Sequence, residues 1–276
     1  MKRIFSLSIL LLSLTGIIAA QNSIVPIVHL NISETETSSG WSYLLGGVEN
    51  GKFVDAKTTF AKMKRDQKFT LFDFVKGKTG DFSLGEFKAG PGACMENYFA
   101  ESEITGATNF AVGTSASWEV LPRKWQAASV TNANYKKAVA DVLRARGLSK
   151  SPVKIEKAVR VDLDGDGADE VLLLATHSVF NESIGNYQTG NYSMLLMRKT
   201  VGGKVRNTII GGHFLTKKND YYGGSFSLAG IADFNGDGKM EILVETSGYE
   251  EGWIRVYEIN AGKMTEIKAL SYYCGA

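Results

Sequence analysis

The sequence predicts a mainly β protein built from antiparallel strands, with two four-stranded units in its C-terminal half and one packing helix. Two acidic, glycine-rich stretches, residues 162–170 and 233–241, are each preceded and followed by short apolar runs that suit buried strands. The composition agrees, because 30 Gly residues supply turns, Pro is scarce at 4, and 14 Phe and 11 Tyr residues favour pleated surfaces.

The first twenty residues have the form of a secretory signal peptide. Lys2 and Arg3 precede an apolar run, and a small-residue exit follows at 17–20. The run is interrupted by Ser and Thr and is short for a membrane span of about 20 residues, so cleavage is favoured over an uncleaved anchor. We therefore expect a secreted or periplasmic protein without a membrane span after cleavage, in which residues 21–40 form a flexible leader.

Residues 41–130 are predicted to form a β-rich N-terminal domain whose role the sequence does not indicate. Asn50-Gly51 lies between two strand-like stretches and predicts a tight hairpin turn. A second hairpin is expected from residues 69–75 and 81–84, and residues 108–120 suit one or two more strands.

One amphipathic helix is predicted after this region. Asn132 or Thr131 can cap its start, an apolar stripe follows at helical spacing, and Gly147 can end it. We group this helix with the repeats in a second region, residues 131–276.

The two units of that region share one order of elements: strand, acidic loop, and three further strands. The strands are expected at 158–161, 170–176, 192–198 and 205–215 in the first unit, and at 225–231, 241–246, 253–259 and 264–273 in the second.

Each acidic stretch places an oxygen-bearing side chain at positions 1, 3, 5 and 9 and Gly at positions 4 and 6. Alternating oxygens around a tight turn can wrap one hard cation, and Ca²⁺ fits best because it accepts about six to eight oxygens in flexible geometry. The glycines allow backbone angles that are closed to residues with a Cβ. The predicted side-chain ligands are Asp162, Asp164, Asp166 and Glu170 in residues 162–170 (loop 1), and Asp233, Asn235, Asp237 and Glu241 in residues 233–241 (loop 2).

Two alternatives apply to these loops. An EF-hand is disfavoured, because position 12 is Leu173 or Val244 rather than the required Glu, and strands rather than helices follow. A solvated acidic turn without an ion is the other alternative. Within loop 1, Asp169 lies beside Glu170 and could take its place.

The loops and their flanks resemble the FG-GAP or VCBS-type repeat, which also builds the β-propeller of integrin α chains. The resemblance rests on residues 161–173 and 231–244 and covers roughly 153–276, whereas the Phe-Gly and Gly-Ala-Pro signatures of that family are absent. It implies that each loop joins the first two strands of a propeller blade and binds Ca²⁺, with the carbonyls of Ala168 and Lys239 as further ligands.

Two units fall short of the about six or seven blades of a closed propeller. Either the N-terminal half supplies degenerate blades, or the units pack as an open β assembly. We favour the open assembly, because residues 41–125 contain no trace of the loop.

The expected function is that of a secreted calcium-binding module for binding or adhesion, with two Ca²⁺ sites that offset carboxylate repulsion and staple adjacent strands. A cell-surface protein or a glycan is the expected partner. Removal of Lys2 and Arg3 leaves 29 basic and 29 acidic residues, which excludes the basic excess typical of nucleic-acid binders. Cys94 and Cys274 form a candidate disulfide, with two buried thiols as the alternative.

The alternative function is a secreted hydrolase or glycan-binding protein whose site lies in the N-terminal half or at a domain interface, with purely structural calcium. No catalytic residue is identified, because the three His residues fall in no zinc pattern and the chain has no nucleophile elbow or phosphate loop. Tyr249, Trp253 and Tyr257 can form a face for glycan stacking, although burial of that face is an equal alternative.

Overall fold

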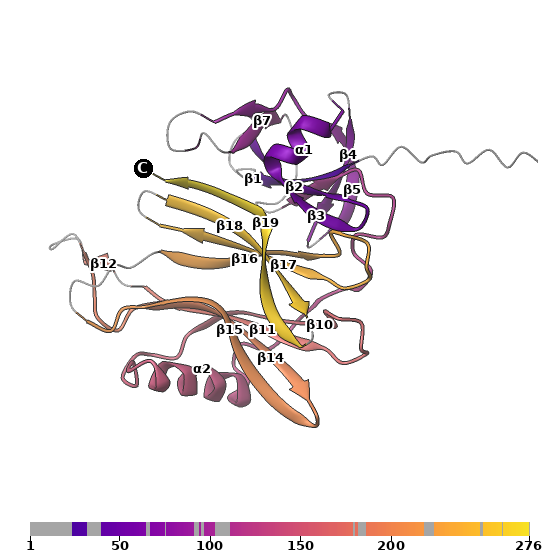
Figure 1. The fold of residues 1–276 in the computed structure, drawn as a ribbon. Helices are drawn as coiled ribbons and strands as arrows, with labels where there is room; N and C mark the ends of the chain where they lie inside the picture. The colour runs from indigo at the N-terminus through magenta and orange to yellow at the C-terminus, as the bar shows by residue number, and fades with distance from the viewer. Residues whose placement is uncertain are drawn as a thin grey trace, which may run out of the picture.

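The protein is described by a computed structural model, in which three antiparallel sheets are stacked (Figure 1). The sheet of the second unit lies in the middle, between the N-terminal sheet and the sheet of the first unit. The structure describes residues 24–31, 40–64, 67–74, 76–90, 94, 97–102, 111–178, 180–181, 186–217, 224–248, 251–260 and 262–275.

The N-terminal sheet contains eight strands in the order β5-β4-β8-β1-β2-β7-β6, with β3 paired to β2. The predicted hairpin at Asn50-Gly51 is confirmed, since both residues have positive φ angles, 54° and 72°. The hairpin of β4 and β5 is also confirmed. The strands are β1 Val25–Asn31, β2 Gly40–Glu49, β3 Lys52–Asp55, β4 Lys68–Asp73, β5 Gly77–Ser83, β6 Lys88–Ala89, β7 Tyr98–Ser102 and β8 Ala111–Thr114.

One part of the expected flexible leader is instead a core strand. Strand β1 (Val25–Asn31) pairs with β2 and β8 inside the N-terminal sheet, and Ile27 and Leu30 are fully buried. Burial of these apolar side chains outweighs the entropy cost of ordering the segment. The signal-peptide prediction at residues 1–20 and the remainder of the leader, 21–23 and 32–39, lie outside the described residues.

A short helix that the sequence interpretation missed, α1 (Ala56–Lys62), directly follows β3. Asp55 is its N-cap, and the Asp55 carboxylate accepts a 2.7 Å hydrogen bond from the Thr58 N–H. The cap satisfies one of the N–H groups that a helix start leaves free, which explains why the strand turns into a helix at this residue.

The predicted packing helix is confirmed as α2 (Ala133–Ala145), with Asn132 as its N-cap and Gly147 at a positive φ of 79° after its end. Val139 and Leu143 are buried against Leu173 and Met194 of the first unit's sheet. Helix α2 therefore covers the outer face of that sheet, as Figure 1 shows.

Both units form four-stranded antiparallel sheets, as predicted. The first has the order β15-β14-β11-β10, and β9 (Gln126–Ala127), from the region assigned to the N-terminal domain, extends it beside β10; the second has the order β16-β17-β18-β19. The strands are β10 Ile155–Val161, β11 Glu170–His177, β14 Tyr192–Val201, β15 Lys204–Phe214, β16 Ser225–Ala232, β17 Glu241–Ser247, β18 Glu251–Asn260 and β19 Lys263–Gly275, with a small ribbon of β12 Phe180–Asn181 and β13 Asn186–Tyr187.

The middle sheet is buried on both faces, which explains the continuous apolar runs after the loops. On β17, Ile242 and Val244 pack against the first unit, next to Leu172 and Leu195. The intervening Leu243 faces the N-terminal sheet. Among the described strands no barrel closes, so the fold is an open β assembly.

Cys94 and Cys274 stand at disulfide distance, with their Cα atoms 4.8 Å apart. They connect the N-terminal region to the end of β19, a sequence separation of 180 residues. No described helix has the length and apolar character needed to cross a membrane.

Candidate metal centre

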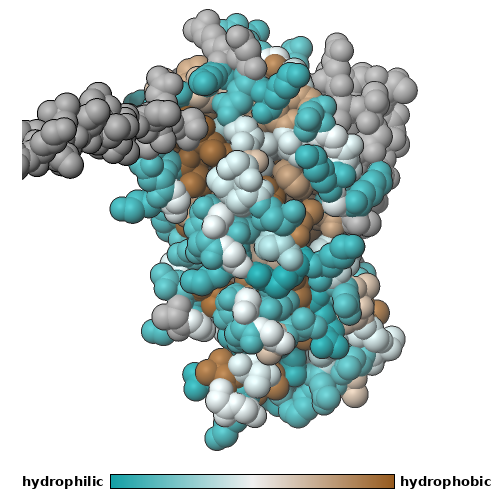
Figure 2. Space-filling model, turned by 90° about the vertical axis from the view of Figure 1, so that its right-hand side faces the viewer, coloured by the Kyte–Doolittle hydropathy of each residue, from teal (hydrophilic) through white to brown (hydrophobic). Residues whose placement is uncertain are grey.

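The two loops lie at the same end of neighbouring sheets. Loop 1 connects β10 to β11 and loop 2 connects β16 to β17, and both project at the right-hand side of Figure 1. The Met240 N–H donates a 2.7 Å hydrogen bond to the Leu163 carbonyl, so the loops touch. Figure 2, which views the molecule from that side, shows a mainly hydrophilic face with small hydrophobic patches.

Position 1 of each loop organises the backbone turn. The Asp162 carboxylate accepts hydrogen bonds from the N–H groups of Gly165 at 2.8 Å and Gly167 at 3.1 Å. Both glycines have positive φ angles, 75° and 85°, as the pattern predicts. In loop 2, Asp233 accepts from the N–H groups of Gly236 at 2.6 Å and Gly238 at 2.8 Å, so the two loops share one fold.

Position 9 of each loop is a buried carboxylate. Glu170 and Glu241 are each 1% exposed. One oxygen of Glu170 accepts from the Leu163 N–H at 2.9 Å, and one oxygen of Glu241 accepts from the Phe234 N–H at 2.8 Å. Asp169, the alternative to Glu170, is exposed and forms a 3.0 Å ion pair with Arg160.

Positions 3 and 5 bring further oxygens to the same turn. In loop 1, Asp164 and Asp166 each place a carboxylate oxygen within 4.8 Å of one from Asp162 and of one another. In loop 2, Asn235 accepts from the Asp237 N–H at 3.1 Å.

Position 7, where the resemblance implies carbonyl ligands, is exposed in both loops. The Ala168 N–H donates to Asp166 at 2.9 Å, and the Lys239 N–H donates to Asp237 at 2.8 Å. The position 7 backbone is thereby held next to the position 5 carboxylate in the same way in both loops.

Lys199 of β14 reaches into loop 1. The spacing of residues within the loop does not predict this contact. Its side chain is 8% exposed, and its ammonium group donates to Glu170 at 2.6 Å. The same ammonium group lies 2.8 Å from an oxygen of Asp164 and 3.1 Å from an oxygen of Asp166. The carboxylates of positions 3, 5 and 9 thus surround one positive charge.

This arrangement perturbs the titration of the groups involved. Burial by itself would lower the pKa of Lys199, but the hydrogen bonds to three carboxylates outweigh it and raise the pKa above its usual range. A backbone hydrogen bond from Ala168 and the contact with Lys199 lower the pKa of Asp166. Burial raises the pKa of Glu170, and Lys199 offsets part of that rise.

Loop 2 has carboxylates at positions 1, 5 and 9 and Asn235 at position 3, and it has no counterpart of Lys199. Burial raises the pKa of Glu241 to about 9, and the charges of Asp233, Asp237 and Glu258 add to the rise. Burial also raises the pKa of Asp233. Among the described residues, no ion pair reaches any of these four carboxylates.

Two side chains from outside the units hold the loops. The Arg123 guanidinium donates to the carbonyls of Asp162 and Leu163 in loop 1 and to that of Gly238 in loop 2, the last at 2.7 Å. Trp118 donates from its indole N–H to the Asp233 carbonyl at 3.0 Å. Sequence reasoning missed both, because neither belongs to a recognisable motif.

The donor set of loop 2 suits a hard cation. Asp233, Asn235, Asp237 and Glu241 offer only oxygen, the ligand atom that Ca²⁺ and Mg²⁺ prefer and that soft metals disfavour. Glu241 uses one oxygen on the Phe234 N–H, so its second oxygen can serve an ion. By residue type, these donors are therefore the ones that a Ca²⁺ site would use.

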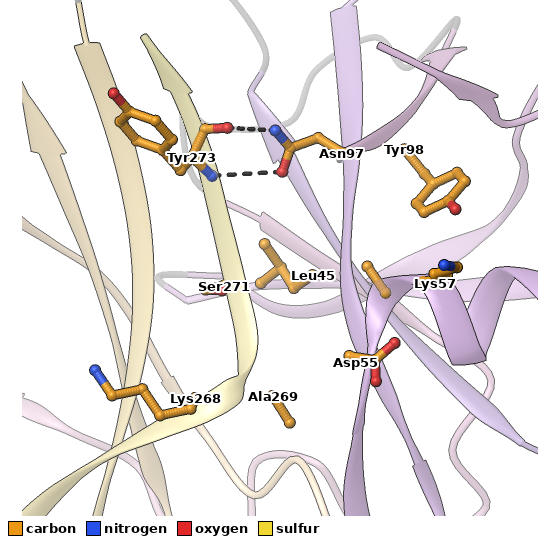
Figure 3. A pocket seen from close by; sticks show the side chains of 10 residues that line it. Leu45, Asp55, Lys57, Asn97, Tyr98, Lys268, Ala269, Ser271 and Tyr273 are labelled. Carbon is orange, nitrogen blue, oxygen red and sulfur yellow. Dashed lines mark hydrogen bonds between the residues drawn. The ribbon is translucent and has the colours of Figure 1, made fainter. Parts of the chain in front are cut away.

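A separate pocket of about 700 Å³ lies between β19 and the α1 region (Figure 3). Tyr98 and Tyr273 are among its lining residues, and Asn97 bridges the gap by hydrogen bonds to the Tyr273 backbone. Its one carboxylate, Asp55, caps α1 through the Thr58 N–H. The described lining therefore holds no pair of carboxylates for acid–base catalysis.

The aromatic face proposed for glycan stacking is largely closed. Tyr257 belongs to the core between the two units and is 8% exposed. Trp253 is half-buried, with its ring centroid 4.3 Å from that of Tyr273 and Arg255 lying over it at 4.1 Å. The third residue, Tyr249, lies outside the described residues.

Comparisons of the chain with protein-family models, with curated proteins and with solved structures each give no match.

Proposed function

We propose that this chain is a secreted calcium-binding repeat protein in which Ca²⁺ at loop 2 fixes the β16–β17 hairpin, within a module for binding or adhesion to a cell-surface protein or glycan. The observation that carries the proposal is the buried carboxylate of Glu241. It is 1% exposed and lies in the field of Asp233, Asp237 and Glu258. A buried carboxylate without a positive partner is costly, and a divalent ion would remove that cost.

Calcium is favoured over other ions by the donors and the setting. The loop offers oxygens from a flexible turn, whereas Mg²⁺ demands near-octahedral geometry and releases water reluctantly. The predicted signal peptide supports an extracellular or periplasmic setting, where even the weak affinity of extracellular modules would keep a site filled. The resemblance to FG-GAP or VCBS-type repeats supports the same ion.

The role of the ion is structural in this proposal. Loop 2 is bonded to loop 1 through Met240 and Leu163, and Arg123 donates to both loops. An ion that stiffens loop 2 therefore stabilises the contact between the two sheets as well as one hairpin. Loop 1 offers the same positions for ligands, and its occupancy depends on Lys199.

The test is thermal unfolding of the purified protein after metal removal with EDTA. Ca²⁺ at about 100 times its dissociation constant stabilises a folded protein by about 2.7 kcal/mol. For a chain of this size we expect a rise in Tm of about 5–10 °C. Mg²⁺ at the same concentration should give a smaller rise.

Two matched variants assign the effect to loop 2. Asp237→Asn removes one ligand charge with little change of shape and should greatly reduce the Ca²⁺-dependent rise in Tm. Asp141→Asn changes an exposed carboxylate of α2 and should leave the rise unchanged. A Tm that responds to neither EDTA nor Ca²⁺ would refute the proposal.

A further inference from the structure

The two units differ in the residue that lies opposite the position 9 carboxylate on the neighbouring strand. Val171 pairs with Arg198 across β11 and β14, so the next pair in that register is Glu170 with Lys199. Ile242 pairs with Tyr257 across β17 and β18, and the next pair is Glu241 with Glu258. The residue opposite the position 9 carboxylate is therefore a cation in the first unit and an anion in the second.

We propose that Lys199 is the built-in cation of loop 1, so that loop 1 closes without a metal ion and the chain holds a single Ca²⁺, at loop 2. The inference about loop 2 rests on the function proposed above. The inference about loop 1 does not, because it concerns a contact within the chain.

The contacts of Lys199 are those of a loop ion. A lysine ammonium group is a compact charge with three donors. In loop 1 those donors meet the carboxylates of Asp164, Asp166 and Glu170, at shortest distances of 2.6–3.1 Å. These are the side chains of positions 3, 5 and 9, from which the loop would ligate a metal.

The remaining polar groups of loop 1 are also satisfied. Both oxygens of Asp162 accept backbone N–H groups, and the second oxygen of Glu170 accepts from Leu163. A divalent ion in this loop would have to displace the ammonium group of a side chain that is 8% exposed, and would leave that group as a buried charge without a partner. Such a charge is strongly unfavourable, so Lys199 competes effectively with the ion.

The second unit lacks this competitor. Glu258 is half-buried on β18, and its charge acts on Glu241. An added carboxylate near the loop strengthens attraction to a divalent ion. The residue opposite position 9 is thus Lys199 at the loop that we expect to close without a metal ion, and Glu258 at the loop that we expect to bind one.

The experiment measures the number of Ca²⁺ ions bound per chain by calorimetric titration of the EDTA-treated full protein. We expect one ion for the natural sequence and two for Lys199→Met, which keeps the length of the side chain without its charge. Glu258→Lys supplies loop 2 with an ammonium group and should bind none. Lys204→Met, an exposed lysine at the start of β15, is the matched control and should still bind one ion.

The outcomes separate this inference from the proposed function. Two ions on the natural sequence would overturn the inference and leave calcium binding intact. No ion on the natural sequence but one on Lys199→Met would refute calcium at loop 2 and uphold the role of Lys199. An unchanged count in Lys199→Met would overturn that role.

Two arms cover the remaining cases. If Lys199→Met fails to fold, the count on the natural sequence and the loss of binding in Glu258→Lys still decide, because two ions or retained binding would each contradict the inference. In Lys199→Met combined with Asp237→Asn, the ion that remains should be the one at loop 1.

Discussion

Met240 and Leu163 join the two loops directly, through a 2.7 Å hydrogen bond from the Met240 N–H to the Leu163 carbonyl. Both side chains are also buried in the core between the units, at 2% and 0% exposure. The loops are therefore joined by a backbone hydrogen bond and by shared core packing, and a change in either loop is expected to reach the other.

Among the polar side chains that contact the two loops, Arg123 should have the largest effect on stability when it is replaced. Its guanidinium group donates to three carbonyls, two in loop 1 and one in loop 2. Loss of hydrogen bonds from a charged donor costs about 1.5–3 kcal/mol, so Arg123→Met should lower the free energy of unfolding by about that amount. Urea denaturation measures it.

The neighbouring exposed residue gives the matched control for this prediction. Lys124→Met removes a charge of the same sign without touching the loops and should change the free energy of unfolding by less than about 0.5 kcal/mol. Equal effects of the two variants would show that the hydrogen bonds from Arg123 to the loops do not stabilise the protein.

The local parts of the site were predictable from the sequence, because the hydrogen bonds that shape each loop join residues only a few positions apart. Asp162 and Asp233 bond glycines three and five residues onward, and these spacings are visible in the chain. The flanking strands were likewise predicted from short apolar runs, which burial on two faces requires.

The non-local parts were not predictable, because they depend on strand register. Lys199 is 29 residues from Glu170, and only the pairing of β14 with β11 brings them together. Arg123 meets Gly238 across 115 residues. The segment of β1 is predicted as part of a flexible leader because a run of Ser, Thr and Glu residues at 33–39 follows its apolar residues.

The glycines of loop 2 provide a second prediction. A Cβ at Gly236 would lie 2.9 Å from the Trp118 indole, whereas a Cβ at Gly238 would meet no atom within 4 Å. Both residues have positive φ angles, 77° and 81°, so Ala at either position carries a backbone cost of about 1–2 kcal/mol.

The Gly236→Ala variant should therefore be the more destabilised of the pair by thermal unfolding, since only there must the indole move. Because the backbone cost is the same in both variants, the difference between their Tm values reports the contact with the Trp118 indole. If Gly238→Ala proves equal or worse, Trp118 does not lie over the loop as described.

The cysteine pair gives a third prediction. Cys94 and Cys274 are 180 residues apart in sequence with Cα atoms 4.8 Å apart. A crosslink over so long a loop stabilises by up to about 5 kcal/mol in the chain-entropy estimate. Cys274→Ser should lower the free energy of unfolding by up to that amount. The natural protein under reducing conditions should have the same free energy of unfolding as this variant. Two reactive thiols in the unreduced, unfolded protein would exclude the disulfide.

His29 provides the pH dependence of stability. It is fully buried on β1, and burial lowers its pKa from 6.5 to about 4. Above pH 6.5 the side chain is neutral in the folded and unfolded chain and has no effect. Below pH 6.5 the unfolded chain binds a proton that the folded protein excludes, so stability is lost as the pH falls toward 4.

The expected loss from this histidine is about 2 kcal/mol between pH 7.5 and pH 5, measured by urea unfolding. His29→Gln should remove that part of the pH dependence whatever its effect on stability at pH 7.5, and His177→Gln, at the half-buried end of β11, is the matched control. NMR titration of the folded protein offers a direct check. A His29 ring that titrates near pH 6.5 would contradict its burial in the N-terminal sheet.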